Sequence, residues 1–307
     1  MDQLKQRILL TGANGFLGQK LIEKLIGMPG FELIATSKSA NRNFIQEGYR
    51  YIPCDFSDTK AIAALLEETS PDIIIHTAAM SSVEACADNP DLCEKVNVEV
   101  VQQLGEYCAS HGKHLTHLST DFVFDGKKGP YAETDDTNPC NAYGSSKLAS
   151  EERLLATGCR AAILRTILVY GVNGDSGRSN LVLWAKKQLE NKQAIKVVAD
   201  QWRMPTFVDD LAGACISAME RQAEGVFHIS GGEMMSILEA VEQLADYWQL
   251  DKSLITPISA AAIGQADNRP RTTGFVLDKA RAELGYEPTP FLASLAEIGQ
   301  QFSFYKR

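Results

Sequence analysis

A glycine-rich turn between a strand-like run and a helix-like run constrains this 307-residue chain more than any other feature. The run Arg7–Thr11 is short and apolar, and Gly15–Gly27 carries apolar residues at helical spacing. Gly12 permits a tight turn, Gly15 lets the backbone approach a pyrophosphate, and Gly18 lets the helix pack closely on the sheet. The turn therefore predicts a dinucleotide-binding unit with the phosphates at the helix N-terminus. The cofactor contacts expected from it are Gly12, Asn14, Gly15, Phe16, Leu17 and Gly18.

Strand-like and helix-like runs alternate through the first half of the chain. This alternation predicts an α/β fold, a Rossmann-type doubly wound parallel sheet with a smaller C-terminal substrate-binding cap. The predicted strands are 7–11, 31–36, 50–54, 72–77, 114–119, 161–166 and 226–230, and the predicted helices are 15–27, 58–69, 91–110 and 141–156. The predicted domains are a dinucleotide-binding domain, residues 1–171 with 195–230 returning to it, and a cap made of 172–194 and 231–307.

Charge, hydropathy and cysteine spacing exclude several classes of function. The net charge of −9 argues against a nucleic-acid or anionic-membrane surface. The apolar run before Thr11 is too short for a signal h-region or a membrane span. Seven cysteines are scattered without a Cys-x-x-Cys motif, and Cys86 and Cys93 are too far apart for a zinc knuckle. We expect a cytoplasmic protein with reduced thiols, no metal, and no nucleic-acid or membrane partner.

The residues after the second predicted strand favour NADPH as the cofactor, with NADH also possible. A carboxylate at this point would bind the adenosine ribose of NAD, but the chain reads Ala35–Lys38 without an acid. The hydroxyl of Ser37 and the cations of Lys38 and Arg42 suit a 2′-phosphate. The alternative is that both cations are solvated loop residues.

Asp55 and Phe56 follow the third predicted strand, where the adenine is expected. Asp55 can hydrogen-bond an adenine amino group, and we include both residues among the cofactor contacts. Asp55 can equally cap the helix that begins near Asp58.

Tyr143 and Lys147 stand four residues apart at the start of a predicted helix, so they share one face. A free phenol has a pKa near ~10, and a nearby ammonium group lowers it by favouring the phenolate. Thr120, at the end of the fifth predicted strand, can donate a hydrogen bond to a substrate carbonyl. The pattern predicts Thr120, Tyr143 and Lys147 as the catalytic group of a dehydrogenase or reductase.

These motifs together resemble those of the extended short-chain dehydrogenase/reductases that act on nucleotide sugars. Within that superfamily the chain is most similar to the dTDP-4-dehydrorhamnose reductases. The resemblance covers nearly the whole chain and rests on TGANGFLG (11–18), HTAAMSSVEACADNP (76–90) with Asn97, STDFVFDG (119–126), AYGSSKLASEE (142–152), LRTILVYG (164–171), Met204-Pro205-Thr206, Asp210-Leu211, GVFHISGG (225–232) and Arg269-Pro270-Arg271.

The resemblance implies further site residues and shows three departures. It implies cofactor contacts from Ala78 and Ala79, and substrate contacts from Ser81, Val83, Asp121, Phe122, Arg203 and Arg269. Phe122 stands where the reductases commonly have tyrosine, Phe16 where they usually have glutamine, and Arg203 where a small residue is frequent. Arg269 and Arg271 are expected at the diphosphate of the substrate, or else are solvated loop charges.

The resemblance implies NADPH-dependent reduction of a nucleotide-linked 4-keto-6-deoxy sugar, with dTDP-4-dehydro-rhamnose as the best single substrate. The related dehydratases carry Thr-Asp-Glu, and Phe122 replaces that glutamate here. A nucleotide-sugar epimerase remains an alternative, although epimerases usually show an acid after the second strand. A non-catalytic NADP-binding subunit, resembling the regulatory subunit of methionine adenosyltransferase, is the other alternative. Homodimers formed through helix pairs are frequent in this superfamily.

Overall fold

The computed structural model describes residues 5–174 and 179–305, and the chain folds into two compact units. Unit 1 consists of Met1–Thr120, Asn141–Arg165 and Ala212–Phe227. Unit 2 consists of Asp121–Cys140, Thr166–Leu211 and His228–Arg307. This division differs from the predicted domains, because four segments predicted for the dinucleotide-binding domain belong to unit 2: 121–140, 166–171, 195–211 and 228–230.

Seven strands form the central sheet in the order β11-β6-β5-β4-β1-β2-β3, which confirms the predicted doubly wound fold. β1 pairs in parallel with both β2 and β4, and the pairs β2·β3 and β4·β5 are also parallel. The order reverses direction at β1, so the turn after β1 lies where dinucleotides bind in such sheets. The strands are β1 (Gln6–Thr11), β2 (Phe31–Thr36), β3 (Arg50–Tyr51), β4 (Ile73–His76), β5 (His114–Thr120), β6 (Arg160–Thr166) and β11 (Gly225–Ile229).

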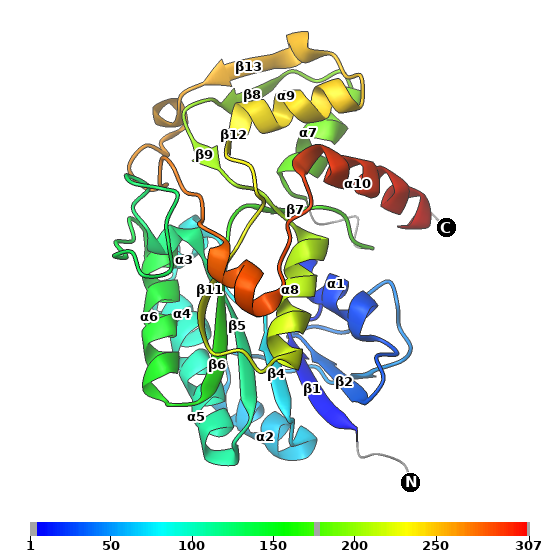
Figure 1. Cartoon of the computed structure of the whole chain (residues 1–307), viewed down its shortest axis with the longest axis vertical. Helices are drawn as coiled ribbons and strands as arrows, with labels where there is room; N and C mark the ends of the chain where they lie inside the picture. Colours follow the sequence, from blue (N-terminus) through cyan, green and yellow to red (C-terminus); the bar gives the residue numbers. More distant parts are fainter. Residues whose placement is uncertain (1–4, 175–178, 306–307) are drawn as a thin grey trace. The chain divides into compact units, whose positions relative to one another are not determined.

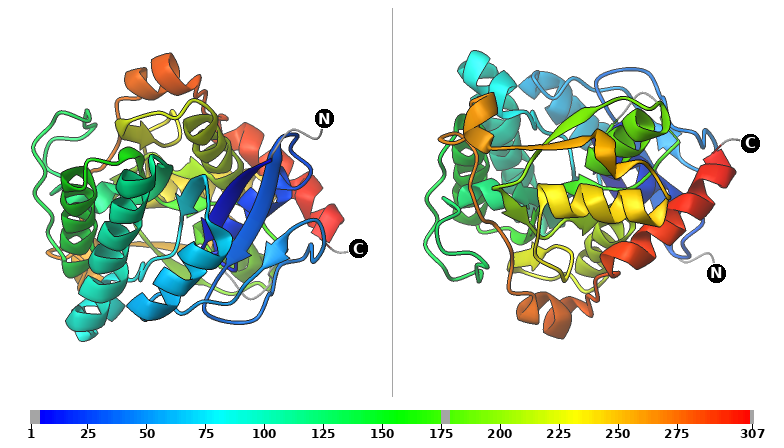
Figure 2. Two further views of the ribbon diagram at one scale, coloured as in Figure 1. Left: turned by 90° about the horizontal axis from the view of Figure 1, so that it is seen from below. Right: turned by 90° about the horizontal axis from the view of Figure 1, so that it is seen from above.

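Helices cover both faces of this sheet (Figures 1 and 2). The helices α2, α5 and α6 gather on one face, and α1 lies on the other. The core under the first group joins alternate apolar residues of the strands to one stripe of each helix; it includes Leu9, Ile34, Ile74, Leu115, Ile163, Ile62, Leu66, Leu104 and Leu154. The helices are α1 (Phe16–Leu25), α2 (Thr59–Thr69), α3 (Val83–Asp88), α4 (Pro90–Glu94), α5 (Val100–His111), α6 (Ala142–Ala156) and α8 (Val208–Glu220).

The predicted helix 91–110 is interrupted in the structure. A π-helical turn, η1 (Lys95–Glu99), separates α4 from α5. The prediction also missed α3, a short helix capped by the Ser82 side chain. Pro90 cannot continue α3, because it lacks an N–H group, and it begins α4 instead.

The expectation that every cysteine is reduced is wrong for one pair, which joins α3 to α4. Cys86 and Cys93 form a disulfide, with their Cα atoms 5.1 Å apart. Spacing alone predicted no pairing, because the break between the two helices was not foreseen. Outside this pair, the cysteines with no disulfide bond are Cys54, Cys108, Cys140, Cys159 and Cys215.

Unit 2 has its own apolar core, built by α7, α9 and α10 with β8 and β12. Its strands form three two-stranded ladders: β7 with β10 and β8 with β13 in parallel, and β9 with β12 antiparallel. The helix α9 begins with a capping box between Ser236 and Glu239. The elements are η2 (Asp121–Val123), β7 (Val169–Tyr170), α7 (Leu181–Glu190), β8 (Ile195–Val198), β9 (Trp202–Arg203), β10 (Thr206–Phe207), β12 (Met235–Ser236), α9 (Ile237–Tyr247), η3 (Lys252–Leu254), β13 (Ile255–Ile258), η4 (Ala260–Ile263), η5 (Ala280–Leu284) and α10 (Phe291–Tyr305).

A buried ion pair fastens α6 to the sheet in unit 1. Arg165 on β6 lies 2.7 Å from Glu151 on α6, and their side chains are 5% and 3% exposed. Ser119 on β5 donates a further hydrogen bond to the Glu151 carboxylate. A buried pair of this kind is costly to break from one side, because the remaining charge stays in the low-dielectric interior.

We predict that Arg165→Met lowers the free energy of unfolding by about 3–5 kcal/mol, because the buried Glu151 carboxylate loses the guanidinium group that pairs with it. Urea unfolding followed by circular dichroism measures this difference. The matched control is Arg50→Met, which removes an ion pair to Glu68 whose partners are about half exposed; it should cost less than about 1 kcal/mol. Equal losses of unfolding free energy in the two variants would contradict the view that the buried Arg165–Glu151 pair matters more than the exposed Arg50–Glu68 pair.

Candidate active site

The helix α6 presents the predicted tyrosine and lysine on one face. Asn141 begins the helix, and its side chain accepts a 2.8 Å hydrogen bond from the Gly144 N–H. Tyr143 is half-buried and Lys147 is 2% exposed, one turn apart. Thr120 is the last residue of β5 and is 6% exposed. All three predicted catalytic residues therefore belong to unit 1.

The ammonium group of Lys147 is buried against the sheet. Its Nζ atom lies 3.1 Å from His117 Nε2 on β5. Burial lowers the pKa of Lys147 to about 7, and the carboxylate of Glu151 acts in the opposite direction. Burial, together with the Lys147 charge, holds the pKa of His117 well below its usual value. A neutral imidazole at this position can accept a hydrogen bond from the ammonium group.

His76, at the end of β4, stacks on His117 with ring centroids 5.6 Å apart. Its Nδ1 atom lies 2.8 Å from the hydroxyl of Thr11, and burial lowers its pKa to about 3. The same hydroxyl accepts from the backbone N–H groups of Thr77 and Ala78. These contacts join the end of β1, the start of the glycine turn and the site of Lys147.

Asn97, in the π-helical turn, fixes the loop after β4 to α6. Its Oδ1 atom accepts from the Met80 N–H at 2.8 Å, and its Nδ2 atom donates to Ser146 Oγ at 2.9 Å. Ser146 in turn donates to the carbonyl of Tyr143. The side chain of Asn97 also contacts both sulfur atoms of the disulfide. The motif that contains Asn97 thus positions the backbone around Tyr143.

The glycine turn has the close packing that the sequence predicted. Gly12 has φ +69°, and a Cβ atom there would lie 2.6 Å from Thr77 Oγ1 and 2.7 Å from Ala78 N. Gly15 caps α1 without a side chain, so no side-chain oxygen competes for the first-turn N–H groups. Phe16 and Leu17 occupy the first turn of α1 and are partly buried.

Around the loop after β2, the predicted cofactor residues divide into buried and exposed groups. Ser37 is 9% exposed and accepts from the Asn14 N–H at 2.9 Å. Lys38 is exposed and pairs with Asp55 at 2.9 Å. Hydrogen bonds from Ser57, followed by the contact with Lys38, lower the pKa of Asp55 to about 2. Asp55 does not cap α2, since Asp58 accepts from the first-turn N–H groups of that helix. Phe56 is buried.

The predicted contacts after β4 range from exposed to buried. Ala78 is partly buried, while Ala79 and Ser81 are exposed. Val83 is 6% exposed and begins α3.

The predicted substrate residues of unit 2 have structural partners. Asp121 is 3% exposed, accepts from the Thr273 hydroxyl and lies 3.8 Å from Arg203 Nε. Arg203 donates to the carbonyls of Trp202, Arg271 and Pro270. The side chain of Arg203 therefore ties β9 to the segment 270–271 in this structure. Its substrate role stays a prediction.

Two arginine–aromatic contacts lie in the same unit. Arg269 lies over the ring of Phe122, with its guanidinium carbon 5.8 Å from the ring centroid. Arg271 lies 5.5 Å from the ring centroid of Trp202. The ring of Phe122 thus provides a cation–π contact for Arg269.

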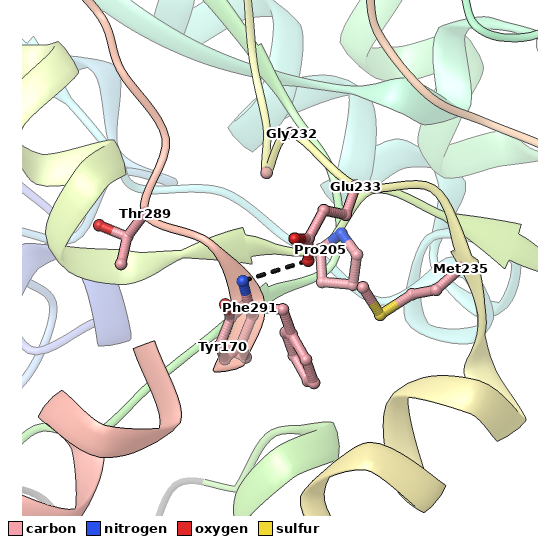
Figure 3. Close-up of a pocket in the computed structure, with 8 residues that line it drawn as sticks. Tyr170, Pro205, Gly232, Glu233, Met235, Thr289 and Phe291 are labelled. Atoms are coloured by element: carbon pink, nitrogen blue, oxygen red, sulfur yellow. Dashed lines mark hydrogen bonds between the residues drawn. The ribbon is translucent and has the colours of Figure 1, made fainter. Parts of the chain in front are cut away.

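Unit 2 also contains a small pocket that the sequence did not indicate. Figure 3 shows its lining, where the Glu233 carboxylate accepts from the Phe291 N–H at 3.2 Å. The lining residues are Tyr170, Pro205, Gly231, Gly232, Glu233, Met235, Thr289 and Phe291. None of them is among the predicted site residues.

Comparison with known proteins supplies the family. The model of the RmlD substrate binding domain matches residues 6–304. The chain belongs to this family. It is 32% identical to methionine adenosyltransferase 2 subunit beta of Xenopus tropicalis, over 98% of this chain and 90% of the relative. It is 30% identical to dTDP-4-dehydrorhamnose reductase of Aggregatibacter actinomycetemcomitans, over 95% of this chain and 98% of the relative.

A solved structure shows the same fold. The crystal structure of dTDP-4-dehydrorhamnose reductase from Bacillus anthracis, in complex with NADP, superposes with a TM-score of 0.82 at 27% identity. The match covers 97% of this chain and 99% of that one. The predicted resemblance to the extended reductases, and with it the oxidoreductase class, is confirmed.

Two negative findings apply to the described ranges 5–174 and 179–305. No helix there has the length and apolar character needed to cross a membrane. No cluster of three or more His, Cys, Asp or Glu side chains there can hold a metal ion.

Sequence reasoning missed the two buried histidines beside Lys147. The run HLTHLST shows His117 three residues before Thr120 in an otherwise apolar strand. A histidine in such a strand needs a polar partner, because burying a polar group without one is unfavourable. The histidine in this strand therefore indicated a buried polar contact, but its partner, Lys147 on α6, is thirty residues away in the sequence.

We predict that the Lys147 side chain titrates near pH 7, far below the ~10.4 of a free lysine. It should be charged below that pH and neutral above it. NMR of the ¹³Cε resonance, assigned with Lys147→Arg, measures the midpoint. His117→Leu removes the acceptor of the ammonium group and should lower the midpoint further, while His111→Leu, an exposed site, should leave it unchanged. A wild-type midpoint above pH 9 would contradict the burial argument.

Proposed function

We propose that this protein reduces the C4 carbonyl of a nucleotide-linked 4-keto-6-deoxy sugar with NADPH, converting dTDP-4-dehydro-rhamnose to dTDP-rhamnose. The observation that carries the proposal is the buried Lys147 one turn after Tyr143, on a helix that Glu151 and Arg165 fasten to the sheet. Membership in the RmlD family and the similarity to a reductase crystallised with NADP support it.

The glycine turn fits a dinucleotide. Gly12 leaves no space for a side chain beside Thr77, and Gly15 leaves the first-turn N–H groups of α1 without a side-chain cap. Ser37, Lys38 and Arg42 would hold the 2′-phosphate, and Lys147 the nicotinamide ribose. When bound, NADPH supplies the hydride.

The protein's own residues donate the proton and stabilise the carbonyl oxygen of the substrate. The Lys147 ammonium lowers the pKa of the Tyr143 phenol, so that the phenol can give its proton near neutral pH. Thr120 donates a hydrogen bond to the same carbonyl oxygen and stabilises the negative charge that develops on it. His117 stays neutral, and its Nε2 atom lies 3.1 Å from Lys147 Nζ.

A binding role within methionine adenosyltransferase is a second candidate, because several curated relatives carry the name of its subunit beta and align with 98% of this chain. This role needs the dinucleotide fold but no proton donor. Nucleotide-sugar epimerisation has weaker support, since the solved epimerase with a TM-score of 0.86 is only 22% identical and shows the fold alone.

We predict that Tyr143→Phe lowers turnover by ~10²–10⁴-fold, because it removes the proton donor and keeps the packing of the ring. NADPH affinity should persist. Oxidation of NADPH with dTDP-, GDP- and UDP-linked 4-keto sugars, followed by absorbance, measures turnover. Tyr107→Phe is the control, since that tyrosine stacks on His111 in α5.

The panel of sugars separates the two candidates. Oxidation with the dTDP-keto sugar supports the proposal, and oxidation with only another nucleotide's sugar moves the substrate but keeps the mechanism. Tight NADPH binding without oxidation of any sugar, combined with co-purification with a methionine adenosyltransferase, would favour the subunit role. Near wild-type turnover in Tyr143→Phe would show that another group is the acid.

A further inference from the structure

One buried amide in the glycine turn makes an unusual number of hydrogen bonds. The Asn14 side chain is 3% exposed and points to the loop after β2. Its Nδ2 atom lies 2.9 Å from the Ala40 carbonyl, 3.2 Å from Ser39 Oγ and 3.1 Å from the Tyr51 hydroxyl. Two N–H protons are thus shared among three acceptors.

The oxygen of the same amide is also engaged with the loop. Asn14 Oδ1 accepts from the Arg42 N–H at 2.9 Å and from Asn43 Nδ2 at 3.4 Å. Tyr51 completes the network, since its hydroxyl donates to the Ser39 carbonyl at 2.7 Å. The side chain of Asn14 therefore has its hydrogen-bonding capacity filled by the loop 39–43 and Tyr51. Its backbone N–H also has a partner, because it donates to Ser37 Oγ at 2.9 Å.

The loop 39–43 lies among the residues that we propose to hold the 2′-phosphate of NADPH. Ser37, Lys38 and Arg42 lie in it or at its start, and both cations are exposed. Long exposed side chains have much rotamer entropy to lose, so a phosphate site made from them depends on a fixed backbone. The buried side chain of Asn14 contacts this loop near both of its ends, at Ser39 and at Arg42.

We propose that Asn14 is a positioning residue for cofactor specificity: through its amide it fixes the loop 39–43, and so sets the preference for a dinucleotide that carries a 2′-phosphate. The proposal rests on the proposed use of NADPH. In this proposal the Asn14 side chain affects the cofactor through the loop 39–43 and does not contact the cofactor itself.

The test compares the dissociation constants of NADPH and NADH in wild type, Asn14→Ala and Tyr51→Phe by fluorescence titration. Asn14→Ala should weaken NADPH by roughly tenfold or more, because four loop groups lose their partner. It should change NADH by less than about threefold, since NADH lacks the 2′-phosphate. Tyr51→Phe removes two hydrogen bonds of the network, one from Asn14 Nδ2 and one to the Ser39 carbonyl, and leaves the contacts of Asn14 with the loop itself. It should weaken NADPH binding by a smaller factor than Asn14→Ala does.

The matched control is Thr69→Val in α2. Thr69 is 1% exposed and donates one hydrogen bond to the Leu65 carbonyl, away from the loop. It should alter neither dissociation constant by more than about twofold. Titration with 2′,5′-ADP and 5′-ADP repeats the comparison without the nicotinamide, and only the 2′-phosphate compound should respond to Asn14→Ala.

Equal weakening of both cofactors in Asn14→Ala would overturn the proposal, because the residue would then support the whole dinucleotide site. A wild-type protein that binds NADH as tightly as NADPH would also overturn it. These titrations measure cofactor binding and need no sugar substrate. Their outcome is therefore independent of whether the protein reduces the proposed sugar.

Discussion

The burial of one ammonium group shapes this candidate site. Lys147 is nearly inaccessible to water, and its charge is unfavourable in that position unless neighbouring groups stabilise it. His117 supplies an acceptor at 3.1 Å and Glu151 supplies a negative charge. Glu151 also holds Arg165, so the electrostatics of the lysine and the attachment of α6 depend on one carboxylate. Tyr143 stands on the same helix, one turn earlier.

A second set of contacts links this lysine to the glycine turn. Thr11 ends β1, and its hydroxyl joins His76 to the backbone after β4. His76 stacks on His117, the acceptor of the lysine. On the other side of the turn, Asn14 fixes the loop after β2. Thr11 thus supports the side of the turn where the nicotinamide ribose is expected, and Asn14 supports the side where the adenosine ribose is expected.

The sequence predicts the sheet well, because its strands are continuous apolar runs bounded by turn residues. It predicts Tyr143 and Lys147 because helical spacing alone places them together. It does not predict the π-helical turn at Lys95–Glu99 or the disulfide after α3, since both depend on how short helices pack.

Long-range partners are the other limit of sequence reasoning. His117 meets Lys147 across thirty residues, and Asn14 meets Arg42 across twenty-eight; neither contact has a local pattern. Arg203 shows the converse case, because a charge expected at the substrate has three backbone carbonyls as partners.

The central claim is that the Tyr143–Lys147 pair serves hydride transfer to a sugar carbonyl. The most direct measurement supplies NADPH deuterated at the transferable C4 position together with dTDP-4-dehydro-rhamnose, and analyses the sugar by mass spectrometry and NMR. The account predicts one deuterium at C4 of the product and none elsewhere. A sugar recovered without deuterium, from a protein that retains bound NADPH, would contradict it.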